Sequence, residues 1–392
     1  SERRKNFSWL LGDTTRPLFN RAIKGQYPPG STMKPMGALI ALDEGVIDPN
    51  YGLGCSGAYY MCKRPIKCTH KGGGHAANLR IALANSCNSY FSHIYRLAVD
   101  NPRLGDVKDG YAKWKNYMNS FGMGVKLGVD LPSEDKGLIV DTSFYNRLYL
   151  GSWNSCTNVF LGIGQGEMQA TPLQMANVMA IIANKGYYYT PHFVRSIDGN
   201  TDADTILAPF KVKHTVTHMP SSVYEIVQLG MQDVVTSGTA RVAQIPGIDV
   251  CGKTGTAENY GIINGKREQL EDHSWFVCFA PRENPKIAIA VIVENAGFGA
   301  TWAGPIARMM IEKFINDTLS EKSKLDSARI AEKEIILPIL RQKKMRWDSA
   351  APSNKKKEIP GVLKASAPFK KGKEALKMAY MVLWRKEEEQ HA

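Results

Sequence analysis

Three apolar segments in the second half of the chain constrain the fold most. They cover residues 248–258, 274–280 and 286–294 and are rich in Val, Ile, Phe and Ala, which favour strands. Only Pro281–Pro285 separates the last two, and so short a connection joins antiparallel rather than parallel strands. The three segments are therefore predicted to form an antiparallel meander.

Helical patterns bracket this meander. The pattern predicts helices over residues 31–44, 79–97, 172–185 and 221–235, with Ser221 or Ser222 capping the last, and a closing helix over 302–317. Pro35 is compatible with the first helix only in its first turn, where the amides need no helical partner. Residues 50–78, rich in Gly, Cys and basic side chains, are predicted to be an irregular insertion. Helices around an antiparallel sheet indicate an α+β fold.

Charge divides the chain into two parts. Of the 392 residues, those from Leu319 onward hold 18 Lys plus Arg and 10 Asp plus Glu, so this stretch carries 18 − 10 = +8 of the net +13. We predict one domain over 1–318 and a basic, largely flexible tail over 319–392, with a short surface helix over 375–384. A basic tail suits an anionic membrane or an acidic polymer as well as nucleic acid, and no nucleic-acid partner is predicted.

The chain contains no run of 18 apolar residues, and it begins at Ser1 without a signal peptide. We therefore expect a fragment whose targeting segment lies upstream. The cysteine count is seven, so at least one thiol is unpaired within the chain.

Ser31 and Lys34 form an S-x-x-K motif at the start of the first predicted helix. Residues three apart on a helix share a face, so the lysine amine lies within reach of the serine hydroxyl. A neutral amine could take the hydroxyl proton and generate a nucleophile. Since free lysine titrates near 10.4, this chemistry requires a lowered pKa, which burial and a second cation would both produce.

Two further motifs follow. Ser86 and Asn88 form S-x-N, a hydroxyl and an amide that can bridge a lysine and a substrate amide. Lys253, Thr254 and Gly255 form K-T-G in a predicted strand, where a cation and a hydroxyl can bind a carboxylate. Gly255 would let a peptide backbone lie against the strand edge. Each motif alone also fits an ordinary cap, helix or turn.

Together, the order of the motifs is typical of class A β-lactamases and penicillin-binding proteins. Their surroundings resemble class B penicillin-binding proteins, and Gly73–His75 the penicillin-binding protein 2 subgroup. The resemblance covers about residues 14–318 and rests on the segments Arg16–Ala22, Gln26–Pro35, Gly162–Glu167, Thr171–Gln174, Cys251–Ala257 and His273–Phe276.

This resemblance implies a penicillin-binding/β-lactamase-like transpeptidase fold, with an antiparallel sheet flanked by helices plus an all-helical subdomain. It implies a peptidoglycan D,D-transpeptidase with catalytic Ser31 (nucleophile), Lys34 (general base), Ser86 (proton relay) and Asn88. Lys253, Thr254, Gly255 and Thr256 would bind substrate, the amides of Ser31 and Thr256 forming the oxyanion hole.

The resemblance further implies no metal or organic cofactor for the reaction. Implied partners are stem peptides ending in D-Ala–D-Ala, β-lactam antibiotics, a membrane glycosyltransferase and elongation-complex proteins. The implied location is the inner membrane of a bacterium, with the catalytic domain on the periplasmic side.

Two other functions use the same motifs. A serine β-lactamase or a β-lactam sensor is one alternative, and a module that captures wall peptides without catalysis is another. A class A β-lactamase needs a glutamate that activates water, for which Glu167 is the candidate. We interpret Glu167 instead as a carboxylate beside a helix N-terminus.

The irregular insertion holds five potential metal ligands within 21 residues: Cys55, Cys62, Cys68, His70 and His75. A zinc ion or a disulfide could stabilise a loop with so little core. Their spacing matches no compact zinc motif, so a disulfide, a zinc site and neither all stay open.

Overall fold

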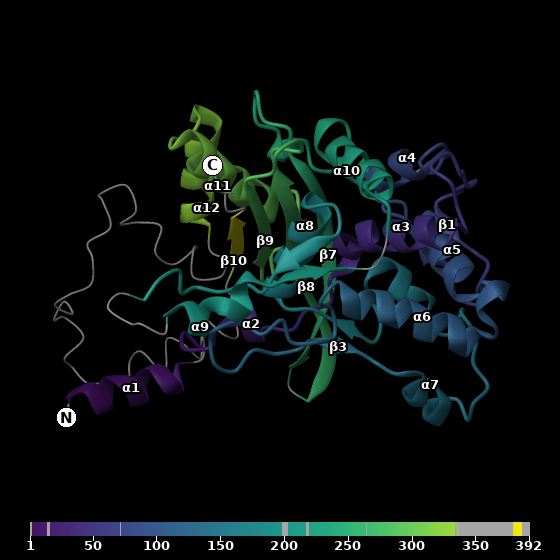
Figure 1. The fold of residues 1–392 in the computed structure, drawn as a ribbon, viewed down its shortest axis with the longest axis horizontal. Coiled ribbons are helices and arrows are strands. Elements are labelled where there is room, and N and C mark those ends of the chain that lie inside the picture. Colours follow the sequence, from purple (N-terminus) through teal and green to yellow (C-terminus); the bar gives the residue numbers. More distant parts are fainter. Residues whose placement is uncertain are drawn as a thin grey trace.

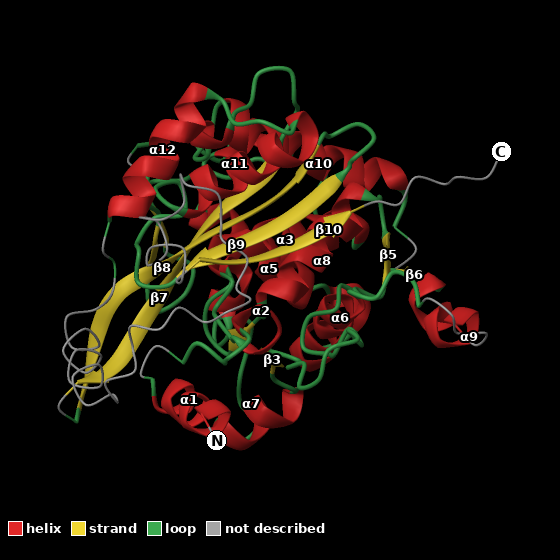
Figure 2. Ribbon diagram, turned by 90° about the vertical axis from the view of Figure 1, so that its left-hand side faces the viewer, coloured by secondary structure: helices red, strands yellow, loops and turns green. Residues whose placement is uncertain are grey.

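The computed structural model describes residues 2–13, 16–70, 72–197, 203–216, 219–263, 265–333, 335 and 379–385 (Figure 1). Its centre is a four-stranded antiparallel sheet in the order β10-β9-β8-β7. The strands are β7 (Cys251–Ile263), β8 (Lys266–Ala280), β9 (Ile287–Val293) and β10 (Ala379–Arg385). The predicted meander is confirmed, and its first hairpin runs further than expected, as a two-stranded ribbon beyond the sheet (Figure 2).

Helices cover both faces of this sheet (Figure 2). Val277 and Phe279 of β8 join the core formed with α8 (Pro172–Ala183), whereas Phe276 and Cys278 join the core beneath α11 (Ala303–Asn316). Every residue of β9 is buried. A strand covered on both faces reads as a continuous apolar run, which is why its sequence shows no alternation of polar and apolar residues.

A mainly helical subdomain packs beside the sheet, and the α+β fold class is confirmed. This part contains α3 (Lys34–Asp43), α4 (Leu79–Ala84), α5 (Asn88–Val99), α6 (Val107–Ser120) and α7 (Thr142–Leu148). The insertion is irregular as predicted, apart from the two-residue strands β1 (Ala58–Tyr59) and β2 (Ile66–Lys67).

The remaining elements are short, except for α1 and α10. They are α1 (Glu2–Gly12), α2 (Arg21–Lys24), β3 (Leu138–Ile139), β4 (Met168–Gln169), β5 (Tyr187–Tyr189), α9 (Ala203–Leu207), β6 (Lys213–Thr215), α10 (Ser221–Thr236), and the 3-10 turns η1 (Gly30–Met33), η2 (Pro102–Leu104), η3 (Val159–Ile163), η4 (Ala208–Lys211) and η5 (Arg241–Ala243).

Three helix predictions need correction. The first helix begins as η1 and becomes α-helical only at Lys34, which places Pro35 in the first turn as its chemistry requires. The helix predicted over 79–97 is interrupted at Asn85–Cys87 and continues as α5. Neither serine caps α10, because Pro220 holds the cap position and no side chain bonds the first amides.

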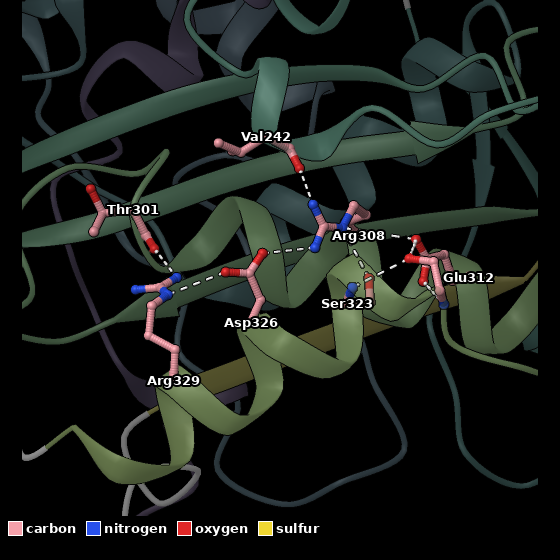
Figure 3. A network of polar contacts seen from close by, with 8 residues as sticks. Val242, Thr301, Arg308, Glu312, Ser323, Asp326 and Arg329 are labelled. Atoms are coloured by element: carbon pink, nitrogen blue, oxygen red, sulfur yellow. Dashed lines mark hydrogen bonds and ion pairs between the residues drawn. The ribbon is translucent and has the colours of Figure 1, made fainter.

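Two described segments beyond Leu319, residues 321–332 and 379–385, form regular elements where a largely flexible tail was predicted. Helix α12 (Glu321–Glu332) packs on α11 through Arg308, which is fully buried (Figure 3). Arg308 donates to Val242 O at 2.7 Å, Ser323 Oγ at 3.0 Å and Asp326 Oδ2 at 2.7 Å. A buried guanidinium is tolerated only with such partners, so α12 is fixed to the domain.

The surface helix predicted over 375–384 is wrong for the residues that are described. Residues 379–385 form β10, which pairs along the whole length of β9. The segment contains Tyr, Val and Trp, residue types that favour strands, and the edge of β9 offers unpaired amides and carbonyls. A long-range pairing of this kind overrides a local helical pattern. Residues 375–378 lie outside the described part.

No helix in the ranges given above combines the length and apolar character needed to cross a lipid bilayer.

Candidate active site

Ser31 lies in η1, which rests directly on β7. The glycines at this contact explain the close approach. A Cβ on Gly30, whose φ is +55°, would stand 2.7 Å from Thr256 O, and one on Gly255 would stand 2.8 Å from Thr32 Cγ2. The space beside Gly255 is thus occupied by η1. Because Gly255 has no side chain, the turn that carries Ser31 can pack against the strand. The sequence pattern did not indicate this role.

Lys34 opens α3 and is fully buried. Its Nζ lies 2.7 Å from Ser86 O, 2.7 Å from Asn88 Oδ1 and 3.0 Å from Ser86 Oγ. Burial lowers the pKa of Lys34 to about 7, against the opposing influence of Cys87 and Cys68. A neutral amine has two hydrogens to donate to these oxygens and one lone pair that can take up a proton.

Ser86 occupies the break between α4 and α5. Its φ of +55° is in the left-handed region, which is strained for a residue with a side chain and costs on the order of 1–3 kcal/mol. The following helix starts at Asn88, whose Nδ2 donates to Lys67 O in the insertion at 2.8 Å. The break therefore turns both side chains of S-x-N toward Lys34, which one continuous helix would not do.

Lys253 is the second buried lysine, on the β7 side of the site. Its Nζ donates to Thr254 O at 3.2 Å. Its pKa is lowered well below the usual value, first by burial and then by the charge of Lys34. The predicted effect of a neighbouring cation thus acts on Lys253, whereas burial is what lowers the pKa of Lys34.

The predicted residues come together from three elements. Ser31 and Lys34 lie on η1 and α3, Ser86 and Asn88 at the α4–α5 break, and Lys253–Thr256 on β7. Gln165 of the segment after η3 donates to Thr256 O at 3.5 Å. Among the described residues no hydrogen bond joins Ser31 Oγ to Lys34 Nζ, so the serine hydroxyl is not tied to the amine it would use.

Thr239 belongs to no motif and is not among the predicted site residues. Its Oγ1 lies 2.7 Å from Thr254 Oγ1. The preceding glycine, Gly238, offered the only signal in the sequence, and its packing could not be foreseen.

Glu167 is bonded by a tyrosine. Its Oε2 accepts a hydrogen bond from Tyr145 of α7 at 3.0 Å. The N-terminus of α8 is capped instead by Thr171 and Gln174, which bond each other's backbone amides. Glu167 thus has a tyrosine partner, and its interpretation as a carboxylate beside the N-terminus of that helix stays a prediction.

The cysteines and His70 of the insertion fall into two sets, each of which includes a cysteine from outside the insertion. Cys62 forms a disulfide, with Cys156 rather than with another cysteine of the insertion. Cys55, Cys68, His70 and Cys87 instead gather their ligand atoms within 4.8 Å of one another. Cys87 is the middle residue of S-x-N and was not in the predicted set.

This second set fits a tetrahedral zinc ion. The Sγ–Sγ distances are 3.7 Å between Cys55 and Cys68 and 4.0 Å between Cys68 and Cys87. Zinc–sulfur bonds of about 2.3 Å place tetrahedral ligands about 3.8 Å apart. Both ring nitrogens of His70 are buried without a partner of normal hydrogen-bond geometry in the described part of the chain. An ion here would be structural and would join the insertion to the Ser86 turn.

Comparison with known proteins gives a consistent result. Residues 2–312 match the family described as "Penicillin binding protein transpeptidase domain". The peptidoglycan D,D-transpeptidase MrdA of Acinetobacter baumannii is 36% identical over 309 residues, 76% of this chain and 44% of that protein. MrdA of Haemophilus influenzae is 31% identical, over 82% of this chain and 49% of that protein. The chain spans about half the length of these curated relatives.

Solved structures agree. Pseudomonas aeruginosa PBP2 in complex with WCK 5153 superposes with a TM-score of 0.66 at 32% identity, covering 81% of this chain and 67% of that one. A complex between penicillin-binding protein PBP2 and MreC from Helicobacter pylori gives 0.65 at 25% identity, covering 80% and 54%.

Proposed function

The chain belongs to the penicillin-binding protein transpeptidase domain family, and from this premise we propose that it is the acyl-transfer domain of a peptidoglycan D,D-transpeptidase. The observation that carries the proposal is the environment of Lys34. A buried lysine with a pKa of about 7, bonded by Ser86 and Asn88 one turn from Ser31, suits a general base for a serine nucleophile.

Acylation then involves two proton transfers. Ser31 Oγ attacks the carbonyl carbon between the two D-Ala residues of a stem peptide, and its proton passes to Lys34 Nζ. When the tetrahedral intermediate collapses, the C–N bond breaks and the departing D-Ala amine receives a proton through Ser86. Ser86 Oγ suits this relay because it lies 3.0 Å from Lys34 Nζ.

The β7 residues would bind the charged parts of the substrate. Lys253 and Thr254 hold the terminal carboxylate, and the amides of Ser31 and Thr256 stabilise the oxyanion; one such donor is worth about 3–4 kcal/mol. The contact of η1 with β7 at Thr256 supports this pairing of amides. A β-lactam would occupy the same site through its own carboxylate.

An amine from a second stem peptide would complete the reaction. It attacks the acyl-serine carbonyl and gives a proton to Lys34, which became neutral when its first proton left with D-Ala. The C–O bond to Ser31 then breaks and Ser31 takes that proton from Lys34, which leaves a cross-link. We propose a membrane glycosyltransferase and an MreC-type protein as partners, because relatives are described in a peptidoglycan synthase complex and with MreC. The catalytic domain would act on the outer side of the bacterial inner membrane.

A labelled penicillin tests the proposal. We expect intact-mass spectrometry to detect one adduct on the parent protein and none on Ser31→Ala, with the same melting temperature. An adduct that persists in Ser31→Ala would reject the assignment, and no adduct on the parent would favour a non-catalytic module.

The same experiment separates a transpeptidase from a β-lactamase. Because the carboxylate of Glu167 is bonded to Tyr145, we expect the adduct to last for many minutes. Loss of the adduct within seconds, with repeated turnover of a chromogenic cephalosporin, would instead indicate a β-lactamase.

A further inference from the structure

Thr239 contacts both sides of the site. It lies between α10 and η5. Its backbone N–H donates to Ala84 O at 3.1 Å, two residues before Ser86, and its Oγ1 lies 2.7 Å from Thr254 Oγ1. One residue therefore links the S-x-N turn to the K-T-G strand.

The packing around it makes this link rigid. A Cβ on Gly238 would stand 2.3 Å from Ala84 O, so only glycine allows the chain to approach α4 so closely. One helical turn earlier, Arg80 of α4 donates to both carboxylate oxygens of Asp233 on α10, at 2.7 and 2.9 Å. The backbone of Thr239 is thus fixed relative to the turn that holds Ser86.

We propose that Thr239 is a positioning residue that orients the hydroxyl of Thr254 toward the substrate carboxylate. This inference rests on the proposed function and deepens it. A hydroxyl has one hydrogen and two lone pairs. If Thr239 donates to Thr254 Oγ1, the hydrogen of Thr254 is left to point at the anion.

This orientation is the one that the substrate needs. A carboxylate only accepts, so Thr254 helps to bind it only as a donor. The Thr254 side chain is half-buried, and nothing else in the described part of the chain bonds its hydroxyl. A donor at Thr239 also strengthens the bond that Thr254 gives, because hydrogen bonds in a chain polarise one another.

The test compares Thr239→Val with Thr239→Ser, after acylation of the parent at Ser31 has been verified with a labelled penicillin. We expect the second-order acylation rate constant of Thr239→Val to fall about fivefold, the effect of one lost hydrogen bond. Thr239→Ser, which keeps the hydroxyl, should stay within about twofold of the parent. The matched control is Ser237→Ala, which should acylate at the parental rate. The exposed Ser237 hydroxyl donates to Asp233 O and, among the described residues, to nothing else.

A double-mutant cycle separates positioning from general damage. In a Thr254→Val background, Thr239→Val should change the rate less than about twofold, because the hydroxyl that it orients is absent. Parental acylation by Thr239→Val would overturn the inference. So would an equal loss in both backgrounds, or a failure of Thr239→Ser to restore the rate. If Thr239→Val is unstable, Thr239→Ala is carried through the same cycle.

Discussion

The pH dependence of acylation tests the two buried lysines directly. In the proposed mechanism Lys34 must be neutral to accept the proton of Ser31, whereas Lys253 must be charged to bind a carboxylate. With a pKa of about 7, the neutral fraction of Lys34 rises from about one tenth at pH 6 to about nine tenths at pH 8. The acylation rate constant should therefore rise about tenfold over this range.

Lys253 determines how the acylation rate constant falls at high pH. Its pKa is lowered too, so its charge is lost at a pH well below that of free lysine, and binding of the carboxylate weakens there. The second-order rate constant should thus follow a bell, with two apparent pKa values that belong to the lysine pair. Lys253→Arg keeps its charge at every pH used and should remove the falling limb while the rising limb remains.

The measurement is the rate of adduct formation by quenched-flow mass spectrometry between pH 5.5 and 10, with the penicillin concentration varied at each pH. Lys34→Arg, whose guanidinium cannot act as a base near neutrality, should show almost no acylation at any pH in this range. A rate that is flat between pH 6 and 8, or a rising limb that disappears in Lys253→Arg, would contradict the assignment of Lys34 as the base.

Three further predictions concern binding and stability. Thr254→Val should slow acylation by an amount worth about 1.5–3 kcal/mol, the range for a hydrogen bond to a charged group, with an unchanged melting temperature; a parental rate would reject its role at the carboxylate. One zinc ion should bind to the cluster of Cys55, Cys68, His70 and Cys87, so removal of zinc by a chelator should expose three reactive thiols and lower the melting temperature. The control Cys251→Ser should leave the zinc content unchanged. A folded protein that contains no metal by elemental analysis would refute this prediction. Arg308→Ala should cost about 3–5 kcal/mol in urea unfolding because Asp326 and Glu312 lose their buried cationic partner. Arg329→Ala, on the exposed side of α12, should cost under about 1 kcal/mol.

The sequence alone predicted the candidate site residues. Ser31–Lys34, Ser86–Asn88 and Lys253–Thr256 offer the proposed nucleophile, base and carboxylate ligands, and such chemistry depends on residue type and order. It also determined the meander and the helices α3, α8, α10 and α11, because apolar periodicity follows from which face each element buries. The full length of the β7–β8 ribbon could not be predicted from the sequence. Its outer half is polar and has no buried face, so it shows no apolar periodicity.

Tertiary structure decided how those residues are positioned. Whether residues 79–97 form one helix or two depends on the strained turn at Ser86, which the bonds from Lys34 hold in place. The lowered pKa of Lys34 is a consequence of burial, and the spacing of residues in a motif does not show whether a side chain is buried. The place of Gly255 against η1, the link from Thr239 to Thr254 and the meeting of Cys87 with Cys55 and Cys68 all join residues distant in the sequence. Such contacts depend on packing between elements, so only the folded chain decides them.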